Sequence, residues 1–205
     1  EISKRSRDYL VSFGERMSVR MMAAYLNKEG IPAKAYDAWD IGFISDSNFM
    51  AAELLDEVWT NIPKYLSSYA EGTDNCIPIV TGFIAKDEKG NITTLGRGGS
   101  DLSATMIGAA MKAEEVQTWK DVDGILNADP KIFPDAVKID HLNYVDTIEL
   151  AYSGAQIIHP KTIKPLQNKS IPLYVKPFGN KHAAGTVIDG NADTVATPII
   201  IVKRN

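Results

Sequence analysis

The sequence Thr93-Thr94-Leu95-Gly96-Arg97-Gly98-Gly99-Ser100-Asp101 joins two apolar segments through a glycine-rich turn. Three glycines within four positions allow a sharp turn and leave backbone N–H groups accessible to a ligand. Ser100 and Asp101 are residue types that commonly cap the start of a helix. The segment 102–111 is apolar on most sides, which predicts a buried helix. The stretch therefore predicts a strand, a tight turn and a helix N-terminus.

Two interpretations of this turn are open. A helix N-terminus offers unpaired N–H groups and the positive end of the helix dipole, and Arg97 can bind a carboxylate or phosphate through two parallel hydrogen bonds. On the other interpretation the glycines serve only the geometry of the turn. The chain contains no G-x-x-x-x-G-K-[ST] motif, and Asp101 stands at the third glycine position of the dinucleotide fingerprint. The sequence thus gives no support to either of these two phosphate-binding motifs.

The composition is that of a globular protein. The 205 residues are enough to bury a sizeable core, and 44% hydrophobic and 23% charged residues are ordinary values. A net charge of −4 argues against general nucleic-acid binding. No apolar run approaches the ~20 residues that span a bilayer. The single cysteine, Cys76, allows no internal disulfide and fits a reducing compartment.

Helical patterns alternate with strand patterns along the chain, which predicts a layered α/β fold. The segment 3–29 is amphipathic with helical spacing, and Gly14 interrupts the pattern, so Gly14 either begins the long helix or lets another group approach its backbone. Glu15 beside it is either a first-turn carboxylate favoured by the helix dipole or a partner for a cationic group of a ligand. The apolar run Ile77–Ala85 is typical of a strand buried on both faces, and the polar turn 87–91 predicts a hairpin. Further helices are expected over 49–69, 143–152 and 161–167, and further strands over 33–37, 115–119, 171–175, 186–188 and 197–202.

Polar residues follow the predicted strand 115–119. Lys120, Asp121 and Asp123 stand at its C-terminal end, where open parallel sheets bind ligands, and they are candidates for phosphate, ribose or hydrated magnesium contacts. An Asp-Gly turn with solvated charges is the alternative. The three histidines are too scattered to predict a protein-bound metal site, and we interpret His159 as structural.

Taken together, seven stretches resemble the aspartate kinases of the amino acid kinase superfamily, most closely their plant-type monofunctional form. Each stretch is weakly specific alone, but they follow the order of the family across most of the chain. The matching stretches are Val11-Ser12-Phe13-Gly14-Glu15, Ile79-Val80-Thr81-Gly82-Phe83, 93–101, Trp119-Lys120-Asp121-Val122-Asp123-Gly124-Ile125, Ala128-Asp129-Pro130, Gly154-Ala155-Gln156-Ile157-Ile158-His159-Pro160 and Ala184-Gly185-Thr186-Val187.

The resemblance implies a three-layer αβα sandwich with a mainly parallel sheet. It also implies transfer of the γ-phosphoryl group of ATP, with Mg²⁺, to the β-carboxylate of L-aspartate, which gives 4-phospho-L-aspartate in the first step of lysine, threonine and methionine biosynthesis. The expected partners are L-aspartate, ATP and further copies of the chain, with no nucleic acid and no membrane. The expected compartment is the cytoplasm, or the plastid for a plant-like source.

The resemblance also assigns site residues. Glu15 would meet the ammonium group of the substrate, Arg97 would hold a substrate carboxylate, and Asp101 would organise the catalytic lysines. Gln156 stands where many bacterial members carry a lysine, so one cation near the phosphates is missing. The implied catalytic residues are Asp101 and Arg97; the substrate-binding residues are Gly14, Glu15, Arg97, Gly98, Gly99 and Ser100; the nucleotide-binding residues are Lys120, Asp121, Lys131, Gln156 and Ile157.

The ends of the chain lead to a further expectation. The N-terminal strand and Lys-Phe-Gly-Gly-Thr-Ser loop of the family have no counterpart here. We expect residues 1–197 to form a catalytic domain without that strand and loop, and residues 198–205 to lead into an absent regulatory ACT region. Because phosphoryl transfer depends on positioning and charge neutralisation, we expect little or no kinase activity from this fragment alone.

Two other functions are open at this point. One is another amino acid or acylamino acid kinase of the superfamily, such as a glutamate or acetylglutamate kinase. Glu15 and Arg97 discriminate here, because a substrate with both a free ammonium group and an α-carboxylate needs both partners. The other is a nucleotide-binding or interaction module without chemistry of its own.

Overall fold

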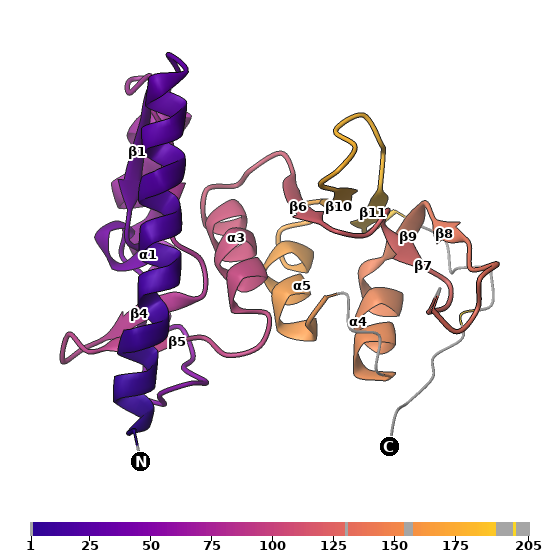
Figure 1. The fold of residues 1–205 in the computed structure, drawn as a ribbon, viewed down its shortest axis with the longest axis horizontal. Helices are drawn as coiled ribbons and strands as arrows, with labels where there is room; N and C mark the ends of the chain where they lie inside the picture. Colours follow the sequence, from indigo (N-terminus) through magenta and orange to yellow (C-terminus); the bar gives the residue numbers. More distant parts are fainter. Residues whose placement is uncertain (1, 130, 154–157, 192–198, 200–205) are drawn as a thin grey trace. The chain divides into compact units, whose positions relative to one another are not determined.

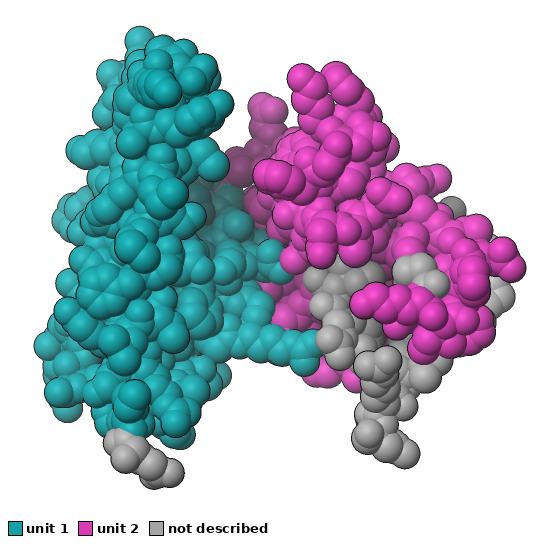
Figure 2. All heavy atoms as spheres, viewed as in Figure 1, with its two compact units in different colours: residues 1–111 teal, residues 112–205 magenta. Residues whose placement is uncertain are grey.

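The computed structural model describes residues 2–129, 131–153, 158–191 and 199, and divides the chain into two compact units, residues 1–111 and 112–205 (Figure 2). The first unit contains α1 (Lys4–Lys28), β1 (Ala33–Tyr36), the 3-10 helix η1 (Ala38–Ile41), β2 (Ile44–Ser45), α2 (Val58–Ala70), β3 (Ile77–Val80), β4 (Ile84–Asp87), β5 (Ile92–Thr94) and α3 (Gly99–Ala110). The second contains β6 (Val116–Lys120), β7 (Ile125–Leu126), β8 (Lys138–Ile139), β9 (His141–Asn143), α4 (Tyr144–Ser153), α5 (Pro160–Gln167), β10 (Leu173–Pro177) and β11 (Thr186–Asp189) (Figure 1).

The long helix α1 confirms the predicted helix but begins earlier than expected. Its N-cap is Ser3, whose hydroxyl accepts a hydrogen bond from the Ser6 N–H at 3.1 Å. Gly14 lies well inside the helix, so the alternative in which it starts the helix is wrong. The cap explains the difference, because a satisfied Ser3 cap stabilises the helix start. A single glycine costs the interior of a helix only about 1 kcal/mol.

The apolar run 77–85 forms two strands, so the prediction of one continuous strand is wrong. β3 pairs in parallel with β1, while β4 pairs in parallel with β2 and antiparallel with β5. Between them the backbone turns at Phe83, which has a φ of 68°. β4 begins with two buried residues, but Ile77 on β3 is 47% exposed, so β3 is not buried on both faces.

The second helix is shorter than its sequence pattern. α2 begins at Val58, and the preceding residues form turns in which the Asp46 carboxylate accepts the N–H groups of Asn48 and Glu53, each at 3.1 Å. Such local side-chain bonds compete with helix formation, which explains why the pattern from residue 49 overpredicts the helix. Pro63 lies within α2 without ending it.

The core of the first unit lies between η1, α2, α3 and the β4–β5 hairpin. The predicted hairpin is confirmed: the Asp87 carboxylate accepts the backbone N–H groups of Lys89 and Asn91 at 3.0 and 2.8 Å and so closes the turn. The buried core residues are Ala38, Ile41, Phe43, Ala52, Val58, Ile62, Leu66, Ala85, Leu95 and Met106.

The second unit is built on a sheet with the strand order β6-β10-β11-β9. β6 is parallel to β10 and β9 is parallel to β11, while β10 and β11 are antiparallel. The strands and helices predicted in this unit up to residue 188 are confirmed to within two residues at each end, and β7, β8 and β9 were not predicted. The strand predicted over 197–202 lies outside the described residues, apart from Ile199.

Both units are mixed α/β structures, and over the two units together four strand pairs are parallel and three are antiparallel, which confirms the predicted fold class. The bounds predicted for the catalytic domain, residues 1–197, remain a prediction. Within the described residues, no helix combines the length and the apolar character needed to cross a bilayer.

Candidate functional site

The glycine-rich turn connects β5 to α3 as predicted, but the helix cap differs. Gly96 and Gly98 have φ angles of 69° and 74°, a left-handed conformation that favours glycine. Gly98 is the N-cap residue of α3, so Ser100 and Asp101 lie in the first turn and are not caps. Asp101 is the acidic residue of this turn, where the helix dipole favours a negative charge.

The turn is held from one side by the Thr81-Gly82-Phe83 segment. A Cβ atom on Gly82 would lie 3.0 Å from the Cα atom of Ser100, and one on Gly99 would lie 2.8 Å from the Phe83 ring. The Ser103 hydroxyl accepts the Phe83 N–H at 3.1 Å and donates to the Gly99 carbonyl at 3.0 Å. The absence of side chains on Gly82 and Gly99 therefore allows two backbone segments to meet closely at the start of α3.

Asp8 on α1 holds the strand that leads into the turn. Its buried carboxylate accepts hydrogen bonds from the Thr94 N–H at 3.0 Å, the Thr94 hydroxyl at 2.8 Å and the Met50 N–H at 2.9 Å. The sequence analysis missed this residue. A lone aspartate among exposed basic residues near a helix start gives no signal of a contact with a residue 86 positions away.

Two groups at the turn are available to an anion. The Gly99 N–H bonds to the Gly96 carbonyl and the Leu102 N–H to the Gly98 carbonyl, while the Ser100 N–H makes no such bond among the described residues. Arg97 is exposed and makes no hydrogen bond or ion pair within the described part of the chain. A free N–H at a helix N-terminus beside an uncommitted guanidinium suits a carboxylate or phosphate.

Glu15 lies on the side of α1 that faces the strands of the first unit. Its side chain is half-buried and, among the described residues, makes no hydrogen bond or ion pair. Burial raises the pKa of the Glu15 carboxyl above its usual value of 4.5. A cationic ligand group would supply the missing partner and lower that pKa again. Gly14 is exposed, with nothing within 4 Å of a Cβ built there, so only Glu15 of the predicted pair points inward.

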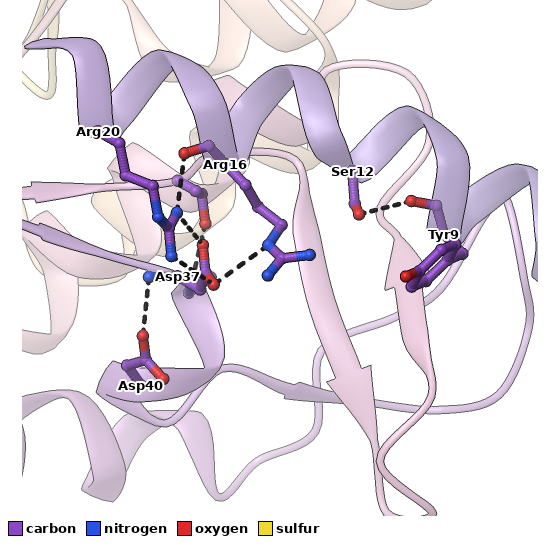
Figure 3. A network of polar contacts seen from close by, with 8 residues as sticks. Tyr9, Ser12, Arg16, Arg20, Asp37 and Asp40 are labelled. Atoms are coloured by element: carbon purple, nitrogen blue, oxygen red, sulfur yellow. Dashed lines mark hydrogen bonds and ion pairs between the residues drawn. The ribbon is translucent and has the colours of Figure 1, made fainter.

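A charged network next to Glu15 fixes the middle of α1 to the end of β1 (Figure 3). Arg20 donates to both carboxylate oxygens of Asp37, at 2.9 and 3.1 Å, and Arg16 donates to one of them at 3.3 Å. Burial raises the pKa of Asp37, but the bonds and charges of the two arginines outweigh it, so the net pKa is lowered. The sequence analysis did not predict this network, whose members stand 17 and 21 residues apart.

The arginine of this network also stacks on aromatic rings. The guanidinium of Arg16 lies 5.5 Å from the centroid of the Phe13 ring and 5.6 Å from that of Trp39. The Lys86 ammonium lies 4.2 Å from the same Trp39 ring. These contacts hold Arg16, and with it the helix turn that carries Glu15, in a defined position.

In the second unit, two of the predicted nucleotide residues, Lys120 and Asp121, lie where β6 ends, beside the end of the neighbouring parallel strand β10. Lys120 ends β6 and pairs in register with Pro177 at the end of β10. The Lys120 carbonyl accepts the Phe178 N–H at 2.6 Å, so the loops after both strands start side by side. Asp121 is exposed directly beyond this edge, which is the location that the sequence analysis expected.

The remaining predicted nucleotide residues are less well placed. Lys131 is exposed, and its backbone N–H bonds to the Asp129 carboxylate at 2.9 Å. Gln156 and Ile157 lie outside the described residues. His159 is the N-cap of α5, where Nδ1 accepts the Lys161 N–H at 3.3 Å, in agreement with a structural role. The described residues contain no cluster of three or more His, Cys, Asp or Glu side chains able to hold a metal ion.

The chain belongs to the amino acid kinase family, which matches residues 1–177. Several relatives that the chain matches are aspartokinases. Aspartokinase 2, chloroplastic, of Arabidopsis thaliana is 46% identical over 208 residues, which cover 100% of this chain and 38% of the relative. The Rickettsia felis aspartokinase is 34% identical over 94% of this chain and 47% of its own length. The chain therefore spans less than half the length of the curated relatives it matches.

A solved structure agrees with these sequence matches. Escherichia coli aspartokinase III, crystallised with aspartate and ADP, superposes with a TM-score of 0.84 at 30% identity, over 93% of this chain and 42% of its own. UMP kinase from Bacillus anthracis superposes with a TM-score of 0.65 at 17% identity, which supports the fold alone.

Proposed function

We propose that this chain carries the substrate and nucleotide sites of an aspartokinase, which phosphorylates the β-carboxylate of L-aspartate with ATP. The observation that carries the proposal is the pair of uncommitted charges in the first unit, inward-facing Glu15 and exposed Arg97. The support from outside the chain is the fold of aspartokinase III, which was crystallised with aspartate and ADP.

The first unit offers partners of both signs to an amino acid. Glu15 binds the ammonium group, and its burial favours a cationic partner over water. Arg97 binds a carboxylate, together with the Ser100 N–H and the N-terminal end of α3. Gly98 and Gly99 keep this end free of side chains. Asp101, in the first turn, orients the cationic groups that neutralise the transferred phosphoryl group.

The second unit binds the nucleotide at the carboxyl ends of β6 and β10. Lys120 and Lys131 contact the phosphates, and Asp121 contacts the ribose or the water shell of a magnesium ion that arrives with ATP. Gln156 and Ile157 complete this site by resemblance only. We also propose a homo-oligomer. The Arabidopsis thaliana relatives are named chloroplastic, so a chain from a plant-like source would act in the plastid and one from another source in the cytoplasm.

The test is calorimetric binding, which measures each site separately. Arg97→Ala should weaken L-aspartate binding by about 10- to 100-fold, the usual loss for a hydrogen-bonded charge, and leave Mg-ADP binding unchanged. Asp121→Ala should weaken Mg-ADP binding and leave aspartate binding unchanged. If Arg97→Ala binds aspartate as well as the parent chain does, the assigned substrate site is wrong.

A second comparison tests Glu15 and separates this function from an acylamino acid kinase. N-acetyl-L-aspartate lacks the ammonium group, so it should bind poorly to the parent chain and no worse to Glu15→Gln. Because the pKa of Glu15 is raised, L-aspartate binding should weaken as the pH falls towards that pKa, and Glu15→Gln should remove this pH dependence. Tighter binding of the acetylated compound than of aspartate would favour the acylamino acid kinase.

A further inference from the structure

Asp8 and Glu15 lie on the same face of α1, two helical turns apart. The inward face of the helix carries Asp8, Ser12, Glu15 and Val19, at intervals of three or four residues. Seven residues of helix rise by about 10.5 Å, a length that the helical hydrogen bonds keep constant. A segment that is bonded to Asp8 is therefore kept at a fixed height along α1 relative to Glu15.

Asp8 holds the end of β5, three residues before Arg97, where α1 lies against that strand (Figure 1). One carboxylate oxygen, Oδ2, accepts the N–H groups of both Thr94 and Met50, at 3.0 and 2.9 Å, and Oδ1 accepts the Thr94 hydroxyl at 2.8 Å. Asp8 is 1% exposed, and within the described residues no ion pair involves it. A buried carboxylate is costly without hydrogen bonds, so Asp8 and its three donors hold one another in place.

The segment 50–52 extends this anchor to the glycine-rich turn. A Cβ on Gly96 would lie 3.1 Å from the Met50 carbonyl oxygen, so a side chain at that position would crowd the segment. The Ala52 N–H also bonds to the Thr94 carbonyl at 2.9 Å. Met50 has a left-handed φ of 72°, and such strain persists only where the surrounding contacts fix the backbone. The bond from its N–H to Asp8 is one of those contacts.

Arg97 follows Gly96 directly, so these contacts set the place of its backbone. We propose that Asp8 is a positioning residue for substrate recognition, which fixes Arg97 relative to Glu15. Two charges that bind the ammonium group and a carboxylate of one amino acid must keep one separation, because joint binding depends on it. The helix α1 supplies this separation, since it carries Glu15 itself and holds the Arg97 turn through Asp8. This role rests on the substrate site proposed above.

The advantage of L-aspartate over succinate measures this separation. Succinate has the two carboxylates of aspartate but no ammonium group, so it can use Arg97 and not Glu15. Aspartate gains from the second contact only when both charges stand at the right distance from each other. A looser Asp8 anchor should therefore weaken aspartate binding more than succinate binding.

Thr94→Val tests the anchor, and Thr93→Val is the matched control. Valine keeps the shape of threonine and removes the hydroxyl, which bonds to Asp8 from Thr94 and to the Ser45 hydroxyl, at 2.6 Å, from Thr93. Both threonines are buried on β5, so the two variants should lose similar stability. Only the Thr94 hydroxyl reaches α1.

NMR titration of the full 205-residue chain measures both dissociation constants. In Thr94→Val the Kd for L-aspartate should rise about 10-fold and the Kd for succinate by less than about 3-fold, because only aspartate needs both charges. Neither Kd should change in Thr93→Val. Thr94→Ser restores the hydroxyl and should bind L-aspartate within about 2-fold of the parent. Mg-ADP binding should be the same in every variant.

A second variant decides the question if Thr94→Val does not fold. Asp8→Asn keeps the shape of the side chain and weakens the same hydrogen bonds by removing the charge. It should raise the Kd for L-aspartate about 3-fold and leave the Kd for succinate nearly unchanged.

Three outcomes would overturn the role of Asp8. Equal rises in the Kd for aspartate in Thr94→Val and Thr93→Val would show that the anchor only stabilises the fold. Equal rises for aspartate and succinate in Thr94→Val would show that the separation from Glu15 is not what the anchor controls. An unchanged Kd for aspartate in Thr94→Val and Asp8→Asn would show that Arg97 keeps its place without the anchor.

Failure of the substrate site itself gives a different result. In that case Arg97→Ala would bind aspartate as well as the parent chain does, and the role of Asp8 would fall with the site. If Arg97→Ala weakens aspartate binding and Thr94→Val does not, the substrate site stands and only the role of Asp8 is wrong.

Discussion

The two faces of α1 differ in the reverse sense to an ordinary amphipathic helix, because its large apolar side chains lie on the exposed face and not on the buried one. The inner face buries Asp8, Ser12, Val19 and Ala23, which are small or polar, while the large apolar side chains point outward. Hydrogen bonds such as those of Asp8 hold the inner face to the rest of the unit, whereas the outer face is distinguished only by its apolar side chains. This difference teaches that one helix can be fixed to its own unit by polar contacts while its large apolar side chains stay exposed in that unit.

Among the substitutions that test this comparison, Asp8→Ala should cause the largest change in the free energy of unfolding. The change leaves the Thr94 N–H, the Thr94 hydroxyl and the Met50 N–H without their acceptor inside the protein. Each lost partner costs about 1–3 kcal/mol when the donor stays buried, so we expect a loss of about 3 kcal/mol or more in the free energy of unfolding. Urea denaturation measures it.

The control for this prediction comes from the outer face. Met17→Ala removes a large side chain that is mostly exposed, so at concentrations where the chain is monomeric it should change the free energy of unfolding by less than about 0.5 kcal/mol. Equal losses in Met17→Ala and Asp8→Ala would show that the two faces do not differ in the way proposed.

A smaller effect is expected at the second polar anchor of the inner face. Asp37→Asn removes the charge that pairs with Arg20 and Arg16. Because the Arg20 side chain is 50% exposed, solvent screens the pair, and we expect a loss of about 1 kcal/mol. Differential scanning calorimetry of the two proteins measures it.

The pH dependence of this pair has a definite sign. The folded-state pKa of Asp37 lies below its usual value of 3.8, so its stabilisation is fully present above that value and disappears as the pH falls through the lowered pKa. The stability difference between the parent and Asp37→Asn should therefore shrink below about pH 4, as the linkage relation requires. A difference that stays constant down to pH 2 would mean that charge pairing is not its cause.

The sequence predicted most elements but not the contacts between them. Hydrophobic spacing and turn residues act locally, so α1, the β4–β5 hairpin, α3, β6, α4, α5 and β10 could be predicted. The break at Phe83 could not, because it depends on how Gly82 packs against Ser100 and Gly99 against Phe83 at the start of α3. Periodicity located the apolar side of α1, but only tertiary contacts such as that of Asp8 show which side faces the strands.

The candidate site was predictable to a similar degree. Arg97 and the glycine-rich turn follow from residue types alone, and the strand-end position of Asp121 follows from the order of elements. The roles given to Glu15 and Asp101 came only through the family resemblance, because a single carboxylate carries no local signal. The Arg16–Arg20–Asp37 network was missed, since pairs separated by 17 and 21 residues leave no periodic pattern.

The smallest effect, and the sharpest distinction between the faces, is expected at glycine. Gly14→Ala on the outer face meets open space and removes a residue that costs a helix about 1 kcal/mol, so the monomer should gain about 0.5–1 kcal/mol. Gly99→Ala, in the first turn of α3, is the matched control. Its new methyl group would lie 2.8 Å from the Phe83 ring and 3.0 Å from the Leu95 Cβ, so this variant should lose stability.

The measurement is thermal unfolding of both glycine variants beside the parent. Opposite signs for Gly14→Ala and Gly99→Ala would show that the first glycine serves no purpose within its own unit, while the second is required by packing. A loss of stability in Gly14→Ala would mean that this glycine serves the fold of its own unit.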